Sequence, residues 1–356
     1  MPRSAEVYGK PFQVGVQLQA QDIRCPYMES ECDGGGNRHQ TSINPARYEA
    51  VTRLLPVQNL VSSAICSIQT QESEPWIVCP RRLLYLHTDP VNEYQSDLFA
   101  YLVDLFGFNH TDIAVWSEVS WKKKGTDIET DFDYRFDYII APVTYVPVES
   151  AAAASGCDVK KLGSLRGLVV EQQTGNVLFP TSGVGVLEVM TSSTSSSNKK
   201  LGNTISEAFV NSVLGNDHQA PGINKRQVWA RMVSQLIAKS EMGLAWGGKT
   251  VWVLQKNLVD YIARATGLPL NDFRAEQLSE VNIVSASVAF GKDGAAGSLR
   301  DLSLFSGAIG ERKGGGFIDI VRAPSIPSRA ELNYALLDQA RKPLILGKKR
   351  SRPHAV

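Results

Sequence analysis

The chain has 356 residues, of which 43% are hydrophobic and 21% are charged, and its formal net charge is +1. These values are typical of a globular protein with one large domain or two smaller ones, and they exclude a strongly basic surface spread over the whole molecule. We find no stretch of 18 apolar residues that could span a membrane and no apolar segment of a secretory signal near the first residue. We therefore expect a cytoplasmic protein whose five cysteines are reduced.

The first half of the chain predicts a loop-rich region followed by a helix and several strands. Residues 1–92 hold four of the five cysteines and a glycine-rich segment at 33–39. Apolar residues at helical spacing predict a helix over 94–106. Strands are predicted over 113–119, 134–146, 163–175 and 184–192, with a charged loop at 122–131 between the first two.

The second half predicts alternating helices and strands. A serine-rich run at 191–200 is expected to form a loop. Asn224 with Gln227 forms a capping pair that opens a helix. The apolar stripe of this helix indicates a core-facing side and consists of Val228, Trp229, Met232, Val233, Leu236 and Ile237. A strand over 249–255, a helix that ends at Gly267 and a strand over 281–290 follow.

Helices and strands that alternate in this way indicate an α/β fold around one sheet. We divide the chain into a four-cysteine region at 1–92, a core at 93–300 and a C-terminal extension with a basic tail at 301–356.

Four cysteines form two pairs in the first region. Six residues separate Cys25 from Cys32, and twelve separate Cys66 from Cys79. A tetrahedral thiolate site draws its ligands from two or more short loops, whereas free cysteines also pack as small hydrophobic residues. Both interpretations stay open on spacing alone. Prolines after the outer cysteines, and segments between them that are poor in core residues, favour a structural metal, while Cys157 stands apart as an ordinary thiol.

Carboxylates on neighbouring strands are the second candidate site. A divalent cation that assists phosphodiester hydrolysis needs such carboxylates. Asp137 lies on one predicted strand, and Glu171 lies on the next with Gln173 on the same face, because side chains alternate along a strand. Glu188 is a rival acid, which we rank lower because the residue two positions later, Met190, cannot orient a water molecule.

The chain resembles the NotI-type restriction endonucleases in the order and the residues of several short motifs. These are RCPYM, SEC, AIC and WIVCPRRLL, followed by FDYIIAPV and VVEQQT. The resemblance implies a PD-(D/E)XK nuclease fold, in which helices flank a central mixed sheet and an N-terminal loop-rich region binds metal. It implies zinc or iron on the four cysteines and magnesium on Asp137 and Glu171, with Gln173 completing the catalytic set. Glu118, in WSEVS, matches an accessory acid.

The function that this resemblance implies is that of a prokaryotic type II restriction endonuclease. Such an enzyme hydrolyses double-stranded DNA at a specific site with Mg²⁺, and a palindromic site implies a homodimer. A non-catalytic DNA- or partner-binding protein with a structural metal is the alternative. A thiolate-zinc hydrolase ranks last, because four cysteine ligands leave no open position on the metal.

Local basic clusters are candidates for contacts with DNA phosphates. They lie at 122–124, 224–231 and 347–352, and a solvated face is the simpler interpretation of any one of them. A loop braced by metal would hold the two arginines that follow Cys79. The residues that we expect to contact DNA are Arg81, Arg82, Lys225 and Arg226.

Overall fold

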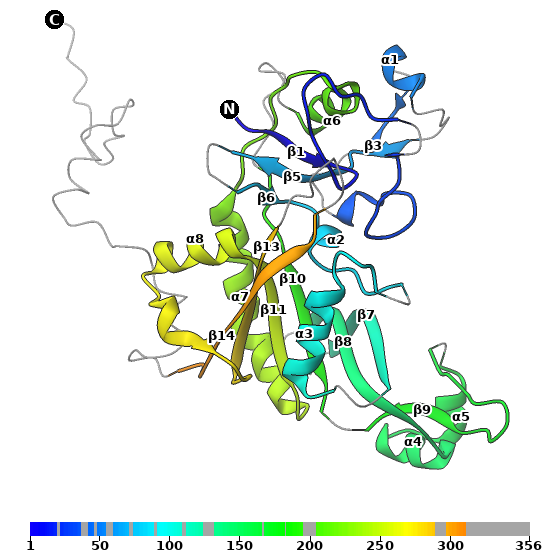
Figure 1. Ribbon diagram of the computed structural model, residues 1–356. Helices are drawn as coiled ribbons and strands as arrows, with labels where there is room; N and C mark the ends of the chain where they lie inside the picture. Colours follow the sequence, from blue (N-terminus) through cyan, green and yellow to red (C-terminus); the bar gives the residue numbers. More distant parts are fainter. Residues whose placement is uncertain are drawn as a thin grey trace, which may run out of the picture.

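The computed structural model describes residues 1–19, 22–36, 42–45, 48–54, 60–70, 74–88, 91–108, 112–123, 132–165, 167–181, 183–194, 204–288 and 297–310. Within these segments the chain forms a large mixed sheet between helices, a smaller N-terminal sheet above it in Figure 1, and a projecting arm. The α/β fold expected from the sequence is confirmed. Among the helices that can be described, none has the length and apolar character needed to cross a membrane.

The large sheet has the strand order β12-β14-β13-β11-β10-β8-β7, and β9 pairs with the far end of β8. Strands β10, β11 and β13 run parallel, whereas β8 and β14 run antiparallel to their neighbours. The strand bounds are β7 Ile113–Lys123, β8 Phe132–Val146, β9 Val177–Pro180, β10 Gly185–Met190, β11 Lys249–Gln255, β12 Arg274–Ala275, β13 Val281–Val288 and β14 Leu299–Gly307.

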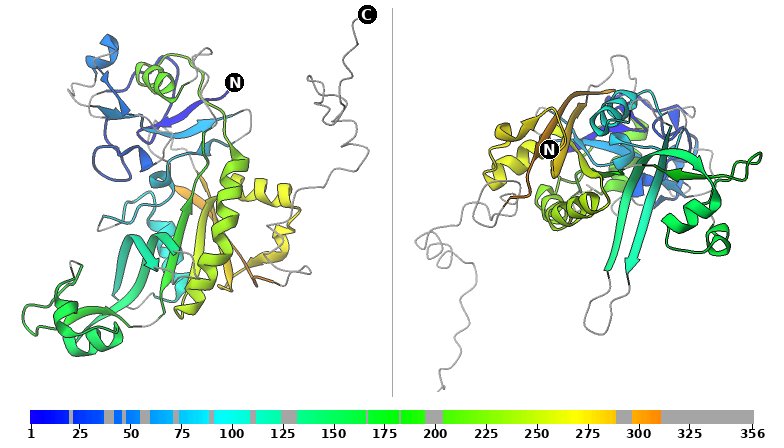
Figure 2. Two further views of the ribbon diagram at one scale, coloured as in Figure 1. Left: turned by 180° about the vertical axis from the view of Figure 1, so that it is seen from behind. Right: turned by 90° about the horizontal axis from the view of Figure 1, so that it is seen from below.

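Helices cover both faces of this sheet. Helix α3 covers one face, where Leu98 and Leu102 pack with Ile140, Leu187 and Val251. Helices α7 and α8 cover the other face, as the view from behind in Figure 2 shows. The helix bounds are α1 Glu49–Thr52, α2 Pro80–Leu83, α3 Ser96–Phe106, α4 Val148–Ala154, α5 Val159–Gly163, α6 Ile205–Leu214, α7 Lys225–Ala245 and α8 Lys256–Thr266, with short 3₁₀ turns at Gly34–Gly36 and Leu270–Phe273.

The predicted ends of α7 and α8 are confirmed. The side chain of Asn224 accepts a hydrogen bond from the backbone N–H of Gln227 at 3.1 Å, which caps the first turn of α7. Helix α8 ends at Gly267, whose φ of 72° is a left-handed conformation that favours glycine. Met232 and Leu236 of α7 are buried in the same cluster as Trp252 of β11, so the apolar stripe faces the sheet as expected.

The N-terminal body is a four-stranded sheet in the order β2-β1-β5-β6. Its strands, together with the separate pair β3 and β4, are β1 Arg3–Val7, β2 Lys10–Pro11, β3 Ser42–Ile43, β4 Val61–Ser62, β5 Ile65–Gln69 and β6 Trp76–Ile77. Helix α6 packs on this body, because Phe209 and Val213 share a core cluster with Val7 and Ile65. A region that ends at residue 92 therefore leaves out part of this body.

The predicted division of the rest of the chain also needs correction. A boundary at residue 300 cuts through β14, which pairs with β13 from Leu299 to Gly307. Of the predicted C-terminal extension, 301–307 belong to the sheet, and 311–356 lie outside the described residues.

The arm holds α4, α5 and β9 and projects from the far end of β8 (Figure 2). The strand predicted over 163–175 lies in this arm, and the prediction is wrong. Helix α5 ends at Gly163, and only an isolated bridge joins Val170 to Val177. A turn follows, in which the N–H of Gly175 donates to the carbonyl of Glu171 at 2.9 Å.

Candidate active site

Three carboxylates form a row across three adjacent strands of the large sheet. The flanking pairs of β7 with β8 place Glu118 opposite Asp137, and those of β10 with β8 place Glu188 beside Asp137 on the other side. Directly opposed residues have Cβ atoms about 4.5–5.5 Å apart. The backbone N–H of Val189 also donates to Oδ2 of Asp137 at 2.8 Å. The register thus gathers three acids that are distant in sequence.

The two inner acids sit in an environment that opposes their charge. Burial, followed by the charge of Asp137, raises the pKa of Glu188 to about 8, and burial also raises the pKa of Asp137. Atom Oε1 of Glu188 is buried, and no described residue forms a hydrogen bond with it. Buried polar atoms nearly always have a partner. A carboxylate oxygen without one, beside a second carboxylate, fits a bound cation.

Glu118 and Asp137 of this row line a cleft of about 770 Å³ between the sheet, α2 and α7, and Glu188 lies buried beside Asp137. Side chains of both charges line the cleft, together with residues of β10. The lining residues are Gly35, Pro80, Arg81, Leu84, His87, Glu118, Arg135, Asp137, Tyr138, Val189, Met190, Thr191, Ser192, Ser193, Gln227 and Arg231. The cleft is therefore wide and polar, with two acids and three arginines in its wall.

Arg81 is the most firmly held cation of the cleft. Its guanidinium lies 3.2 Å from Oδ2 of Asp33 and 3.9 Å from Oε1 of Glu118. It also lies over the ring of Tyr85, 5.3 Å from the centroid. Arg135 approaches the other oxygen of Glu118 at 3.8 Å. Glu118 itself has a positive φ of 49°, a strained conformation for glutamate that orients it toward these two cations.

Glu171 and Gln173, the predicted partners of Asp137, lie elsewhere. Both belong to the turn that precedes β9, and Gln173 is exposed. Strand β9 meets β8 at Val146, nine residues beyond Asp137, which is about 30 Å along a strand. Oε2 of Glu171 accepts a hydrogen bond from the Thr174 hydroxyl within the same turn. The structure therefore does not bring Glu171 and Gln173 to Asp137, whereas Glu118 lines the same cleft as Asp137.

The four cysteines of the N-terminal region come together in one cluster, as predicted. Cys25, Cys66 and Cys79 are buried, and Cys32 packs against them. The N–H of Gly9 points to the sulfur of Cys66 at 3.3 Å. Burial is the largest cause that raises the pKa of each of the four thiols, so they are protonated as they stand. Cys157 lies apart, in the core of the arm.

The four sulfur donors of this cluster suit a metal ion. Their positions, however, do not surround a common centre. Four thiols in one buried pocket are the ligands of a structural zinc or iron site. A Cβ at Gly35 would lie 2.7 Å from the Cys79 sulfur, so the backbone approaches that sulfur closely. Within the described part of the chain, however, no three His, Cys, Asp or Glu side chains are grouped so that they could hold an ion. Metal binding at the cysteines or at the acid row would require the side chains to draw closer.

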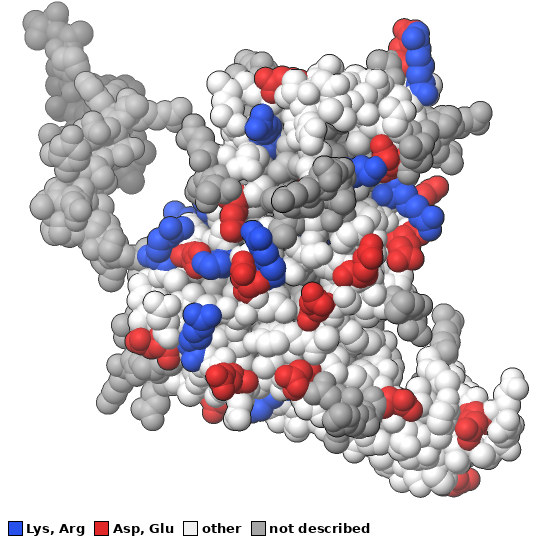
Figure 3. All heavy atoms as spheres, in the orientation of Figure 1, with Lys and Arg blue, Asp and Glu red and all other residues white. Residues whose placement is uncertain are grey.

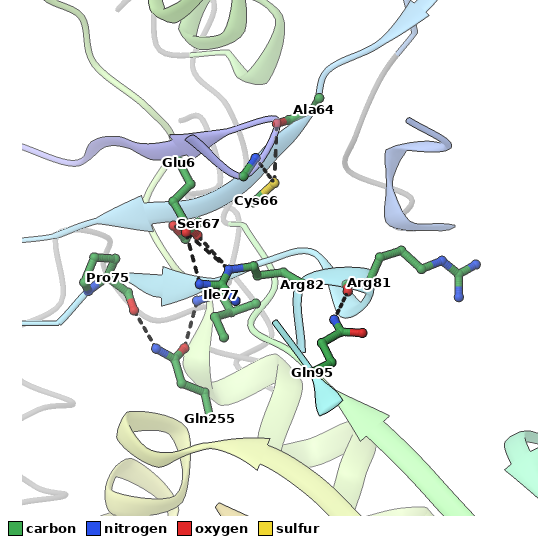
Figure 4. Close-up of polar contacts among 11 residues, drawn as sticks. Glu6, Ala64, Cys66, Ser67, Pro75, Ile77, Arg81, Arg82, Gln95 and Gln255 are labelled. Atoms are coloured by element: carbon green, nitrogen blue, oxygen red, sulfur yellow. Dashed lines mark hydrogen bonds and ion pairs between the residues drawn. The ribbon is translucent and has the colours of Figure 1, made fainter. Parts of the chain in front are cut away.

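The four residues predicted to contact DNA lie in different places in the structure. Arg81 lines the cleft. Arg82 does not, because it is fully buried and its guanidinium bonds both oxygens of Glu6 at 3.1–3.2 Å (Figure 4). Lys225 lies over the ring of Trp76, 4.2 Å from the centroid, and Arg226 is exposed outside the cleft. The prediction that Arg82 contacts DNA is therefore wrong.

Of the three basic runs, the structure describes the side chains of one, 224–231, in which Arg231 lines the cleft. The run at 347–352, residue 124 and the side chains of 122 and 123 lie outside the described residues. On the face shown in Figure 3, the acidic and basic side chains that can be described are interspersed. A phosphate would therefore find concentrated positive charge in the cleft more readily than on this face.

Sequence reasoning named the run that contains Arg231 but missed Lys239 of α7 and Arg135 of β8. Nζ of Lys239 lies 2.6 Å from Oε2 of Glu188, and Arg135 and Arg231 line the cleft. The signal for Lys239 was a charged residue at a core position of an apolar helix stripe. No protein-family model and no curated protein matches the chain.

Proposed function

We propose that the protein is a metal-dependent endonuclease of the NotI type, which hydrolyses phosphodiester bonds of double-stranded DNA in the cleft. The observation that carries the proposal is the pair of Asp137 and Glu188. They stand side by side on neighbouring strands, and one buried oxygen of Glu188 has no hydrogen-bond partner among the residues that the structure describes. The NotI-type resemblance implies an aspartate on one strand and a glutamate on the next. Glu188 takes the place that the sequence assigned to Glu171.

Asp137 and Glu188 would hold a divalent cation such as Mg²⁺, because carboxylate oxygens are the ligands that this hard ion prefers. When bound, the cation lowers the pKa of a water molecule and neutralises charge on phosphate. Glu118 faces the same space and binds Arg81 and Arg135 when DNA is absent. These arginines would turn to phosphate oxygens when DNA enters, since guanidinium groups pair with phosphate through two hydrogen bonds.

The reaction is a hydrolysis. The oxygen of a water molecule forms a bond to phosphorus, and one phosphorus–oxygen ester bond breaks. One proton of that water ends on the departing sugar oxygen as a hydroxyl, and the new oxygen stays on phosphate. Arg81 and Arg231 would position the phosphate in the cleft for this step. The acid row would orient the attacking water molecule.

Two further parts of the proposal follow from the same resemblance. The four-cysteine cluster would bind one zinc or iron ion, which braces the segment between Cys79 and the cleft. A homodimer would cut both strands of a two-fold symmetric site, because each chain carries one acid row. A non-catalytic DNA-binding protein is the rival. This rival explains Glu188 as the salt-bridge partner of Lys239, but it gives no role to Asp137, a half-buried acid that repels phosphate.

Cleavage of plasmid and phage DNA with Mg²⁺ tests the proposal, and four variants locate the site. Asp137→Asn and Glu188→Gln should lose cleavage by about 10²-fold or more. They should still bind DNA when Ca²⁺ replaces Mg²⁺. Glu171→Gln and Gln173→Leu should cut like the unaltered protein, since the turn is distant from the cleft. An inactive Glu171→Gln protein with normal folding would contradict the assignment of the cleft.

A further inference from the structure

Strand β10 supplies the carboxylate of a cleavage site, Glu188, but no polar group two residues after it. Residues alternate along a strand, so Met190 points to the same face as Glu188, and it lines the cleft. A thioether carries no charge and is a weak hydrogen-bond acceptor. It cannot hold a water molecule or a phosphate oxygen in place. The strand therefore provides a carboxylate and, two residues on, no polar group.

Lys239 reaches the same place from helix α7. Its ammonium group donates to Oε2 of Glu188 at 2.6 Å and to the carbonyl of Arg135 at 2.7 Å. The rings of Phe136 and Trp252 lie 5.3 Å and 5.7 Å from it and enclose it on the side of the core. An ammonium group has three N–H bonds, and the described residues accept two of them. The third has no acceptor among the described residues, and Glu188, which holds the ammonium group, lies beside Asp137 of the cleft wall.

Stability alone is a poor reason for this pair. Glu188 is 4% exposed and Lys239 is 3% exposed, so both charges are removed from water. A buried ion pair is often no more stabilising than two apolar side chains of similar size. The surroundings would accept such residues, because Met232, Leu236 and Trp252 form an apolar cluster at this helix–sheet contact. The pair lies next to Asp137 and Met190, which line the polar cleft, so a role in the chemistry of the cleft explains it better than stability does.

We propose that Lys239 is the cationic catalytic residue of this site. Its ammonium group comes from helix α7 and takes the role that a polar side chain at position 190 of β10 would otherwise have. The ammonium group fixes the orientation of Glu188 through one N–H and directs another to the attacking water or to an oxygen of the scissile phosphate. Its positive charge stabilises the negative charge that grows on phosphate as the water adds. This inference rests on the proposed nuclease activity.

The test moves the charge from the helix to the strand. Lys239→Met removes the ammonium group, and Lys239→Met/Met190→Lys restores one two residues after Glu188. Lys256→Met is the matched control, because Lys256 lies on α8 and pairs with Asp260 at the surface. Three quantities are measured on each full-length protein: the single-turnover cleavage rate with Mg²⁺, the DNA dissociation constant with Ca²⁺ in its place, and the unfolding temperature without divalent cation.

Lys239→Met should lose about 10²-fold or more in cleavage rate with little change in DNA affinity, and the double variant should recover most of the lost rate. A purely structural lysine would not allow this recovery, since Met190 lies on a different element. If Lys239→Met does not fold, Lys239→Gln replaces it, because it keeps hydrogen bonds and loses the charge.

Two results would overturn the role of Lys239 alone. The first is a folded Lys239 variant that cuts DNA like the unaltered protein. The second is a folded double variant that binds DNA and shows no recovery. Failure of the unaltered protein to cut DNA with Mg²⁺ would instead overturn the proposed function, and Lys239 with it.

Discussion

Removal of the Arg82 side chain should destabilise the protein strongly and leave the chemistry of the cleft intact. Arg82 and Glu6 are both fully buried, and three N–H···O contacts of 3.1–3.2 Å join them. Ser67 donates a fourth hydrogen bond to Glu6 at 2.8 Å (Figure 4). In Arg82→Ala the Glu6 carboxylate stays buried with Ser67 as its one remaining partner. Breaking a buried pair in this way costs about 3–5 kcal/mol of unfolding free energy.

The assay is urea unfolding followed by tryptophan fluorescence, with Trp76 fully buried on β6 nearby. Arg82→Ala should shift the midpoint far more than Arg226→Ala, which removes an exposed arginine. The double variant Arg82→Met/Glu6→Gln should regain much of the loss, because no unpaired charge then remains. A change below about 1 kcal/mol in Arg82→Ala, the range of an exposed ion pair, would refute the buried pair.

Three further predictions concern other parts of the molecule. Cys66→Ser should lose the zinc or iron that we propose for the cluster and should lower the unfolding temperature, whereas Cys157→Ser should do neither. Elemental analysis measures the metal content, and an active protein without metal would contradict the proposed role of the cluster. Arg81→Ala should weaken binding to all DNA sequences alike and reduce the salt slope of binding by about one; anisotropy titrations with Ca²⁺ that show an unchanged slope would exclude a phosphate contact. Burial lowers the pKa of His218, so the unfolded chain binds its proton more readily and stability should fall as the pH drops below about 6.5. Urea midpoints between pH 5 and 8 should show this loss, and it should be smaller in His218→Gln.

The elements of the core could be predicted because their periodicity is strong. The stripe on α7 and the continuous apolar run of β11 reflect the surface that each element buries. The alternation in β13 predicted a strand, although all eight of its residues are buried. Local capping gave the ends of α7 and α8 for the same reason, since the partners of the cap lie within one turn. The N-terminal strands gave no such signal, because several are only two residues long.

The arm shows why an apolar run can mislead. Val169 and Val170 read as the start of a buried strand, yet each is 49% exposed. Their segment contacts β9 through a single bridge and ends in a turn at Gly175. The pairing of Glu171 with Asp137 depended on that strand being a neighbour of β8 at the right register. Register is a property of the whole sheet, and a local motif does not contain it.

Residues that are adjacent in sequence can also lie in different environments. Arg81 and Arg82 follow Cys79 directly, and the sequence assigned them one role. On the short helix α2 successive side chains point about 100° apart. Arg81 therefore reaches Asp33 and the cleft, while Arg82 turns into the interior toward Glu6. A pair of adjacent cations on a helix is thus better read as two separate hypotheses.

The ranking of Glu188 below Glu171 came from one assumption, that the polar partner of the catalytic glutamate lies two residues later on the same strand. Lys239 shows a different solution, in which the partner comes from a helix packed on that face. The sequence did carry a trace of it. Lys239 lies seven residues after Met232 and three after Leu236, both of which are fully buried, so it falls on the apolar stripe of α7. A lysine at such a position must find an anion inside the protein, and the buried acids available to this helix face belong to the sheet beneath it. Searching for charged residues inside apolar stripes therefore locates a composite site that spacing motifs along one strand cannot reveal.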